Sequence, residues 1–119
     1  MKNLIAWVEI PTTNFERALD FYGKILNIDF EPVDCGQEKM ACFPNNEGAI
    51  IQAEGFEPSG QGVVVSLNAG NDLDGCLERI EKQGGKVIRP KTRIDAEGMG
   101  YFALFTDTES NRIGLYGDK

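Results

Sequence analysis

The sequence predicts an α+β fold made of two similar modules, each with one strand, one helix and three further strands. Two segments carry apolar residues at helical spacing, short strand-like segments flank both, and the helical segments align after a shift of about 58 residues. With 119 residues, the chain is expected to form one domain, with module 1 at about 1–58 and module 2 at about 59–119. The shift places Phe15 on Leu73, Ala18 on Cys76, Leu19 on Leu77 and Tyr22 on Ile80.

The first module is expected to begin with a strand over Leu4–Ile10, which Pro11 ends. Thr13 followed by Glu16 is a capping-box pattern, so we expect a helix to begin there. Asn27 is suited to the left-handed conformation that ends a helix. The apolar stripe of this helix is Phe15, Ala18, Leu19, Tyr22 and Leu26. The three strands expected after it are Asp29–Val33, Lys39–Phe43 and Ala49–Ala53.

The second module is expected to follow a turn-rich stretch over Gly55–Gly62. Val63–Asn68 is predicted to form its first strand, and a helix is predicted from about Asp72 until Gly84 and Gly85 stop it. The apolar face of this helix is Leu73, Cys76, Leu77 and Ile80. The remaining strands are expected at Lys86–Arg89, Gly100–Thr106 and Arg112–Tyr116.

Each predicted sheet has a helix on one face only, so its other face is free to surround a concave cavity. Because side chains alternate along a strand, residues next to the helix-packed ones are expected to line this cavity. On the first and fifth strands, Val8, Ile10, Val63, Val65 and Leu67 are expected to pack against the helices. The candidate cavity residues are Trp7, Glu9, Gln52, Ser66, Asn68, Arg112, Gly114 and Tyr116.

The composition excludes several classes of function. The chain contains no histidine, which rules out a Ser-His-Asp triad, a Cys-His pair and every metal site built on imidazole. Its formal net charge is −7, so the phosphate backbone of a nucleic acid and an anionic membrane surface would both be repelled. We therefore expect a small-molecule partner, with no nucleic acid and no membrane.

The cysteines and the apolar segments predict a cytoplasmic location. Cys35, Cys42 and Cys76 are odd in number and lack the spacing of a zinc site, which favours free thiols in a reducing compartment. The N-terminus lacks an apolar signal region, and no apolar run is long enough to cross a bilayer.

Three segments carry a resemblance to a known family: WVEIPTTNFERALDFYGKILNIDF over residues 7–30, GQGVVVSLNAGNDLDGCLERIEKQGGKV over 60–87 and YFALFTDTESNRIGLYG over 101–117. Together they resemble the glyoxalase / bleomycin resistance protein / extradiol dioxygenase superfamily, also called vicinal oxygen chelate proteins. The sequence is most similar to small members described as predicted enzymes related to lactoylglutathione lyase. The resemblance implies two βαβββ modules forming curved mixed sheets around a cavity, and a homodimer.

The resemblance also implies a metal site, which this sequence does not reproduce. The family's His on the first strand corresponds to Trp7, its His at the start of the second module to Val64 or Val65, and its Glu on the last strand to Gly114. Only Gln52 matches a family ligand. We therefore expect neither a metal nor a cofactor.

Several candidate residues keep alternative interpretations. Trp7 either fills the place of the missing metal site or provides a stacking surface for a ligand. Glu9 is a solvated strand residue, a partner of Arg112, or a catalytic general base. Gln52, Ser66 and Asn68 are interpreted as hydrogen-bonding groups of a polar cavity.

Three functional hypotheses follow. The first is a metal-free protein that binds a small aromatic or amphipathic molecule. The second is an enzyme related to lactoylglutathione lyase, working without a metal or with a hard cation bound by Glu9, Gln52 and Glu54. The third is a stand-alone regulatory or interaction module that retains only the fold. Because each module leaves exposed strand edges and half-open cavities, we also expect two chains to pair about a two-fold axis.

Overall fold

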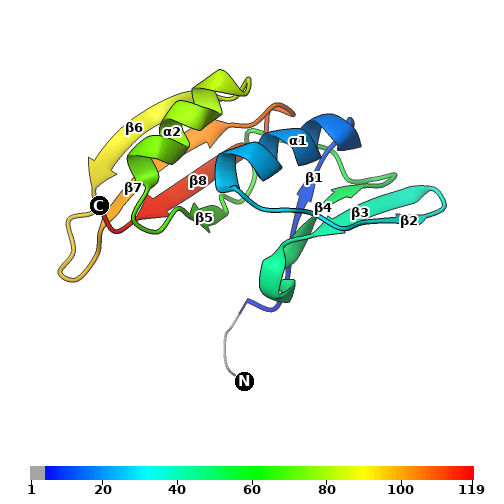
Figure 1. The fold of residues 1–119 in the computed structure, drawn as a ribbon, viewed down its shortest axis with the longest axis horizontal. Coiled ribbons are helices and arrows are strands. Elements are labelled where there is room, and N and C mark those ends of the chain that lie inside the picture. Colours follow the sequence, from blue (N-terminus) through cyan, green and yellow to red (C-terminus); the bar gives the residue numbers. More distant parts are fainter. Residues whose placement is uncertain (1–4) are drawn as a thin grey trace.

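A computed structural model describes residues 5–119 and, for Asp34 and Cys35, the backbone alone. It contains two four-stranded mixed sheets and two main helices, which confirms the predicted α+β class (Figure 1). The elements of the first module are β1 (Val8–Pro11), α1 (Phe15–Leu26), β2 (Pro32–Cys35), β3 (Glu38–Cys42), the short 3-10 helix η1 (Pro44–Asn46) and β4 (Gly48–Gln52). Those of the second are β5 (Ser66–Asn68), α2 (Leu73–Lys82), β6 (Lys86–Arg93), β7 (Tyr101–Thr106) and β8 (Arg112–Gly117).

The two modules repeat the same topology. The strand order is β1-β4-β3-β2 in one sheet and β5-β8-β7-β6 in the other. In both, the first strand pairs in parallel with the last strand, and the remaining pairs are antiparallel. The helices begin at Phe15 and Leu73, the offset that the sequence predicts. The internal repeat expected from the sequence is therefore present in the structure.

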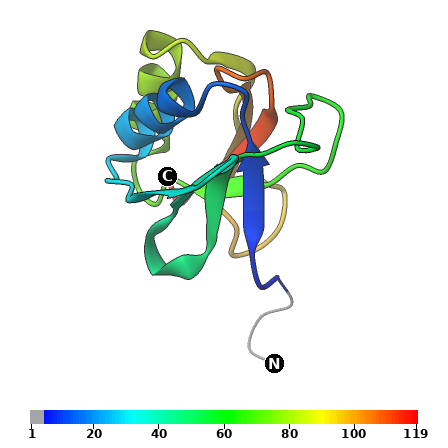
Figure 2. The same cartoon turned by 90° about the vertical axis from the view of Figure 1, so that its right-hand side faces the viewer.

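Both helices lie on the same side of the molecule and contact each other, while the two sheets spread away from them (Figures 1 and 2). The main core lies between the helices and the sheet faces turned toward them, where Phe21 meets Tyr22 edge to face and packs beside Phe105. The sheets do not close into a barrel. Their opposite faces, called helix-distal below, carry no helix.

The N-terminus of α1 differs from the prediction. Asn14, and not Thr13, is the N-cap, because the Asn14 side chain accepts a hydrogen bond from the Arg17 N–H at 3.2 Å. The Thr12 hydroxyl accepts from the Asn14 N–H at 2.9 Å, which fixes the preceding turn. The predicted helix end is correct, since Asn27 adopts a left-handed conformation with φ 54°.

The buried face of α1 is rotated relative to the predicted stripe. Phe21 and Ile25 are buried, whereas Leu19 and Leu26 are only partly buried. The reason is that α1 packs against both its own sheet and α2. Two packing partners bury a wider face of the helix than the single apolar stripe that the sequence predicted. Phe15, Ala18 and Tyr22 are buried as predicted.

Besides β5, three strands differ from their predicted bounds by more than one residue at an end. The first begins at Val8, and Leu4 lies outside the described residues. β2 occupies Pro32–Cys35 instead of Asp29–Val33. β6 continues through Pro90 to Arg93, which an edge strand tolerates because the missing N–H faces away from the sheet.

The largest difference concerns the predicted strand Val63–Asn68, of which only Ser66–Asn68 forms β5. Val63 is 92% exposed and packs against no helix, contrary to the prediction. The preceding residues run as a loop beside β8, where the Ser59 carbonyl accepts a hydrogen bond from the Arg112 N–H at 3.3 Å.

Neither main helix in the described part of the chain is long and apolar enough to cross a membrane. Cys42 and Cys76 are free thiols, and the side chain of Cys35 lies outside the described atoms.

Candidate functional site

Most of the predicted cavity residues share the helix-distal side of the sheets. Ile113 and Leu115 of β8 are buried in the core, so Arg112, Gly114 and Tyr116 face the opposite way. By the same alternation, Ser66 and Asn68 flank Leu67 on β5, and Glu9 lies between Val8 and Ile10 on β1. Alternation along the strands therefore gives the sheet face on which these side chains lie.

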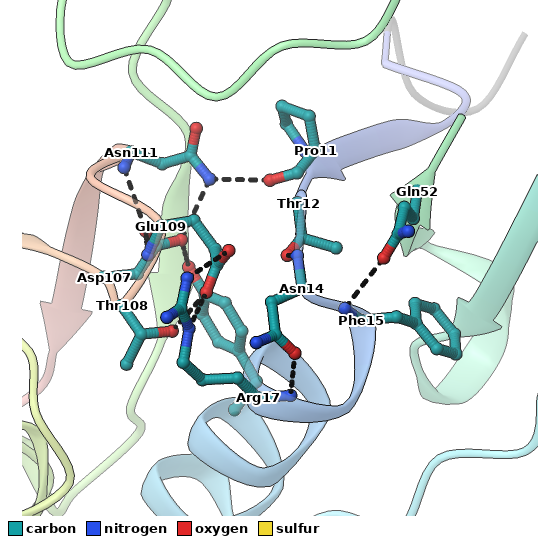
Figure 3. Close-up of polar contacts among 11 residues, drawn as sticks. Pro11, Thr12, Asn14, Phe15, Arg17, Gln52, Asp107, Thr108, Glu109 and Asn111 are labelled. Atoms are coloured by element: carbon teal, nitrogen blue, oxygen red, sulfur yellow. Dashed lines mark hydrogen bonds and ion pairs between the residues drawn. The ribbon is translucent and has the colours of Figure 1, made fainter. Parts of the chain in front are cut away.

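Gln52 is the exception, because its side chain turns toward α1. It follows Ile50 by two positions on β4, and Ile50 belongs to the helix-side core. Its Oε1 accepts a hydrogen bond from the Phe15 N–H at 2.8 Å, at the first turn of α1 (Figure 3). Gln52 thus satisfies a backbone donor that a helix start leaves without a partner in the helix.

Trp7 and Glu9 contact each other. The indole Nε1 donates to Glu9 Oε2 at 3.2 Å, and the Trp7 side chain is 40% exposed. Trp7 therefore does not fill a closed core position within the single chain. Its ring stands at the open side of the first sheet, beside an exposed carboxylate.

Four predicted residues meet on the second sheet. Ser66 pairs with Gly114 and Asn68 pairs with Tyr116 across the parallel β5–β8 ladder. Asn68 Oδ1 accepts from the Gly70 N–H at 2.9 Å, and the Tyr116 hydroxyl accepts from the Gly100 N–H at 3.2 Å. Both polar side chains are thus held by local backbone groups.

A cleft of about 610 Å³ lies between the two modules. We call it the inter-module cleft. One wall comes from β1, the end of α1 and the β3–β4 connection, and the other comes from β5. Its lining is Ile5, Ala6, Val8, Leu26, Ile28, Phe43, Pro44, Asn45, Asn46, Glu47, Val65, Ser66, Leu67 and Asn68. Apolar side chains dominate this lining, and polar groups contributed by both modules accompany them. The sequence predicts only Ser66 and Asn68 of this set as cavity residues, because the β3–β4 connection carries no catalytic or ligand-binding motif.

A smaller pocket of about 130 Å³ lies where the end of β1 approaches the start of β8. We call it the Arg112 pocket. It is lined by Glu9, Ile10, Pro11, Glu57, Ser59, Gly62, Val63, Val65, Asn111, Arg112 and Ile113. Val65 lines both this pocket and the inter-module cleft, so the two spaces are neighbours. Trp7 lines neither of them.

On the helix side, the modules are joined by a group of polar residues that we call the polar joint: Arg17, Tyr22, Asp107, Glu109 and Asn111 (Figure 3). Arg17 binds Glu109 through two hydrogen bonds of 2.8 and 3.0 Å. The Tyr22 hydroxyl donates to Asp107 Oδ2 at 2.6 Å, and Asn111 Nδ2 donates to the Pro11 carbonyl at 2.8 Å.

The turn over residues 107–111 also bonds its own backbone. Asp107 Oδ1 accepts from the N–H groups of Glu109 and Asn111, both at 2.9 Å. The sequence did not reveal that the same carboxylate and its neighbours bind α1, because those partners are far apart along the chain.

The polar joint shifts the pKa values of Glu109 and Tyr22, and Glu109 also raises the pKa of Arg17. Burial alone would raise the pKa of Glu109, but hydrogen bonds from Arg17, Thr108 and Thr12 and the charge of Arg17 outweigh it and lower this pKa to about 2. Burial and the adjacent Asp107 carboxylate raise the pKa of Tyr22 well above 10. Both groups therefore keep one protonation state near neutral pH and serve as structural contacts.

The residues that the resemblance assigns to the family's metal positions are engaged in other contacts or leave little room for a ligand. Trp7 offers an indole N–H that is already donated to Glu9, and Gln52 is directed at α1. A Cβ atom at Gly114 would collide with the Ser66 hydroxyl, so a glutamate at this position would require Ser66 to move. Within the described residues, no group of three or more His, Cys, Asp and Glu side chains is arranged to hold a metal ion.

Comparisons with known proteins agree with this architecture. A glyoxylase-like domain-containing protein of Didymella fabae is 28% identical over 116 residues, which cover 90% of this chain and 88% of that protein. The crystal structure of a glyoxalase/bleomycin resistance protein from Albidiferax ferrireducens T118 has a TM-score of 0.70 at 17% identity, covering 97% of this chain and 99% of that chain. The crystal structure of the fosfomycin resistance protein FosX from Listeria monocytogenes has a TM-score of 0.69 at 16% identity, covering 100% of this chain and 96% of that chain. A family model described as Glyoxalase/Bleomycin resistance protein/Dioxygenase superfamily matches residues 4–115, and the chain therefore belongs to this superfamily.

Proposed function

We propose that this protein binds a small aromatic or amphipathic molecule in the inter-module cleft, without the metal of its family. The observation that carries this proposal is the cleft itself, whose volume of about 610 Å³ lies in the range typical of small-molecule sites. Its walls combine apolar side chains such as Phe43 and Leu67 with a few polar ones such as Ser66 and Asn68. This combination suits a ligand with an apolar body and one or two hydrogen-bonding groups.

Family membership supports a small-molecule role without identifying the ligand. FosX, which shares the fold, is described as a fosfomycin resistance protein, so the same architecture serves resistance to a small antibiotic in that protein. At 16% identity the comparison carries only the fold, and the ligand class proposed here rests on the lining of the cleft.

The proposal is tested by a screen of neutral aromatic and amphipathic compounds, followed by amide chemical shifts in ¹H–¹⁵N spectra. A ligand of the cleft is expected to shift the resonances of Val65–Asn68 and of Asn45–Glu47 together. Ala6→Phe adds a ring to an exposed wall of the cleft and should weaken binding about tenfold or more. The matched control is Ala96→Phe on a remote exposed loop, which should leave affinity unchanged. If a ligand binds both variants with equal affinity, its binding site is not the inter-module cleft.

A second candidate is an enzyme related to lactoylglutathione lyase, with Glu9 as general base. One observation favours it: Glu9 and Arg112 line the same small pocket, so a carboxylate and a cation are available to one guest. The test is conversion of the adduct of methylglyoxal and glutathione by the purified protein. Activity that Glu9→Gln abolishes would support the enzyme, and its absence would leave the binding function.

We further propose that the protein works as a homodimer in the cytoplasm. The edge strands β1 and β5 each pair on one side only, and the helix-distal side of the first sheet exposes Trp7 and Val33. A second chain could pair with the free strand edges and cover the exposed apolar side chains. Light scattering at micromolar concentration should give twice the mass of the chain, and a monomer mass would contradict the dimer. The free thiols of Cys42 and Cys76 are compatible with a reducing cytoplasm.

A further inference from the structure

The guanidinium of Arg112 is incompletely paired inside the molecule. Its Nε is buried and has no hydrogen-bond partner among the described residues. The same side chain donates from Nη2 to the Gly62 carbonyl at 3.3 Å. By contrast, Arg17, which also bridges the two modules, uses both Nε and Nη2 on one carboxylate.

No carboxylate of the described residues forms an ion pair with Arg112, although two of them line its pocket. Glu9, which the sequence suggested as a partner of Arg112, accepts from the Trp7 indole instead. Glu57 is exposed, as Glu9 is. The Arg112 pocket therefore combines one buried cationic donor with two carboxylates at its exposed side.

A ligand that offers a hydrogen-bond acceptor to the unpaired guanidinium N–H would gain binding free energy. Arginine stays charged at every relevant pH, so it cannot relieve the lack of a partner by losing a proton. A buried donor without an acceptor carries its full desolvation cost, which an incoming acceptor would remove. A carboxylate fits best, because the fork of guanidinium N–H groups matches its two oxygens.

We propose that the Arg112 pocket receives the carboxylate of a small organic acid. Glu9 and Glu57 disfavour a doubly charged phosphate, since each added negative charge near them raises the repulsion. The volume of about 130 Å³ accommodates a head group and not a whole ligand. Val65 lines both this pocket and the inter-module cleft, so we expect the apolar body of the same acid to reach from the pocket into the cleft. This last step rests on the proposed function, and it specifies a monoanionic ligand.

Ser59, Gly62 and Val63 form one wall of the Arg112 pocket, and the Gly62 carbonyl accepts from Arg112 Nη2, so we expect this wall to move when the acid reaches Nε. This wall belongs to an exposed loop that also contains Gly60. The loop is held to β8 by the Asn111 side chain, which accepts from the Ser59 N–H at 2.9 Å. Binding of the acid is therefore expected to change the amide resonances of Ser59–Val63 as well as the Arg112 side chain.

The test follows the Nε–H resonances of the arginine side chains in ¹H–¹⁵N spectra of the wild-type chain. Benzoate is the probe, benzyl alcohol is its neutral match, and inorganic phosphate is the dianionic comparison. The expected result is a saturable shift of Arg112 Nε–H with benzoate only, while Arg89, which lies 5.1 Å over the Phe102 ring on the same sheet, stays unchanged. An equal response to benzyl alcohol or phosphate, or no response of Arg112, would overturn the proposal.

Variants then separate this inference from the proposed function. Arg112→Lys keeps the charge but loses the fork, and should weaken benzoate binding about tenfold, whereas Arg89→Lys should have no effect. Glu9→Gln should strengthen benzoate binding by removing a like charge. If benzyl alcohol shifts the Val65–Asn68 amides but benzoate does not move Arg112 Nε–H, the cleft binds ligands and the carboxylate assignment is wrong. If no neutral probe shifts the cleft amides, the proposed function fails on its own.

Discussion

The β7–β8 turn and the β3–β4 connection occupy equivalent positions in the two modules but contact the opposite module differently. The turn between β7 and β8 closes on the start of α1 through the polar joint, where Asp107, Glu109 and Asn111 all find partners. The corresponding β3–β4 connection, Phe43–Glu47, approaches the second module at β5 but leaves the inter-module cleft between them. One contact between the modules is filled with hydrogen bonds, and its counterpart is open.

The difference follows from the residues of the two turns. Asp107-Thr108-Glu109-Ser110-Asn111 provides two carboxylates and an amide, which satisfy α1 and the backbone together. The β3–β4 connection, Phe43-Pro44-Asn45-Asn46-Glu47, uses both asparagines in left-handed backbone conformations. The φ values are 64° at Asn45 and 55° at Asn46. The polar joint can therefore stabilise the arrangement of the modules, and the cleft is free to bind a ligand.

Removal of Asp107 should produce the largest loss of stability. Asp107→Ala leaves the Tyr22 hydroxyl and the backbone N–H groups of Glu109 and Asn111 without their acceptor inside the protein. It also removes one of the two acceptors of the Asn111 side-chain amide. We expect the free energy of unfolding to fall by roughly 3–5 kcal/mol, as for other broken buried polar networks. Urea unfolding followed by circular dichroism measures it, with Asp95→Ala on an exposed loop as control. A loss below about 1 kcal/mol, the level of one ordinary hydrogen bond, would show that the joint does not hold the modules together.

Acid should weaken the polar joint in a defined pH range. The pKa of Glu109 is about 2 in the folded chain against an ordinary value of 4.5, so the unfolded chain takes up the proton first as pH falls. The stabilisation is complete above pH 4.5 and is lost between 4.5 and about 2. This stabilisation amounts to about 2–3 kcal/mol, since one unit of pKa difference corresponds to about 1.4 kcal/mol and solvent around the half-exposed Arg17 side chain weakens the ion pair. Urea midpoints measured across this range should fall in the wild type, and a Glu109→Gln variant with the same slope would refute this origin.

Gln52 tests whether a residue that the sequence assigned to the cavity acts in stability instead. Gln52→Leu removes the acceptor for the first N–H of α1 and should cost about 1 kcal/mol. Ligand affinity of the cleft should not change, since Gln52 does not line it. Thermal melting and the binding assay on one protein sample measure both effects, and Gln61→Leu at an exposed position is the control. A selective loss of affinity would restore Gln52 to the binding site.

Trp7 should show the smallest effect. In the single chain Trp7 is 40% exposed and hydrogen-bonded to Glu9, so at concentrations too low for two chains to pair its fluorescence maximum should lie between those of a buried and a fully solvated indole. Under the same conditions Trp7→Phe should change the free energy of unfolding by less than about 1 kcal/mol, because no closed cavity is created. A loss of several kcal/mol would mean that Trp7 is buried, for example by a second chain.

The local patterns of the sequence determined the class of fold and the repeat. Apolar residues at 3.6-residue spacing identified both helices, and the shift that aligns Phe15 with Leu73 is the offset between the starts of α1 and α2. Strand alternation also placed Glu9, Ser66, Asn68, Arg112, Gly114 and Tyr116 on the helix-distal faces. These features depend on neighbours a few residues away, which a single sequence displays directly.

Only the tertiary structure decided which of those residues share a site. Arg17 and Glu109 are 92 positions apart, Tyr22 and Asp107 are 85 apart, and Gln52 meets Phe15 over 37 positions, so no periodic pattern links them. The inter-module cleft likewise depends on how the β3–β4 connection approaches β5, and the isolation of Arg112 Nε depends on Glu9 bonding Trp7 instead. Spacing along the chain predicts the face on which a side chain lies, whereas its partner depends on the packing of one module against the other.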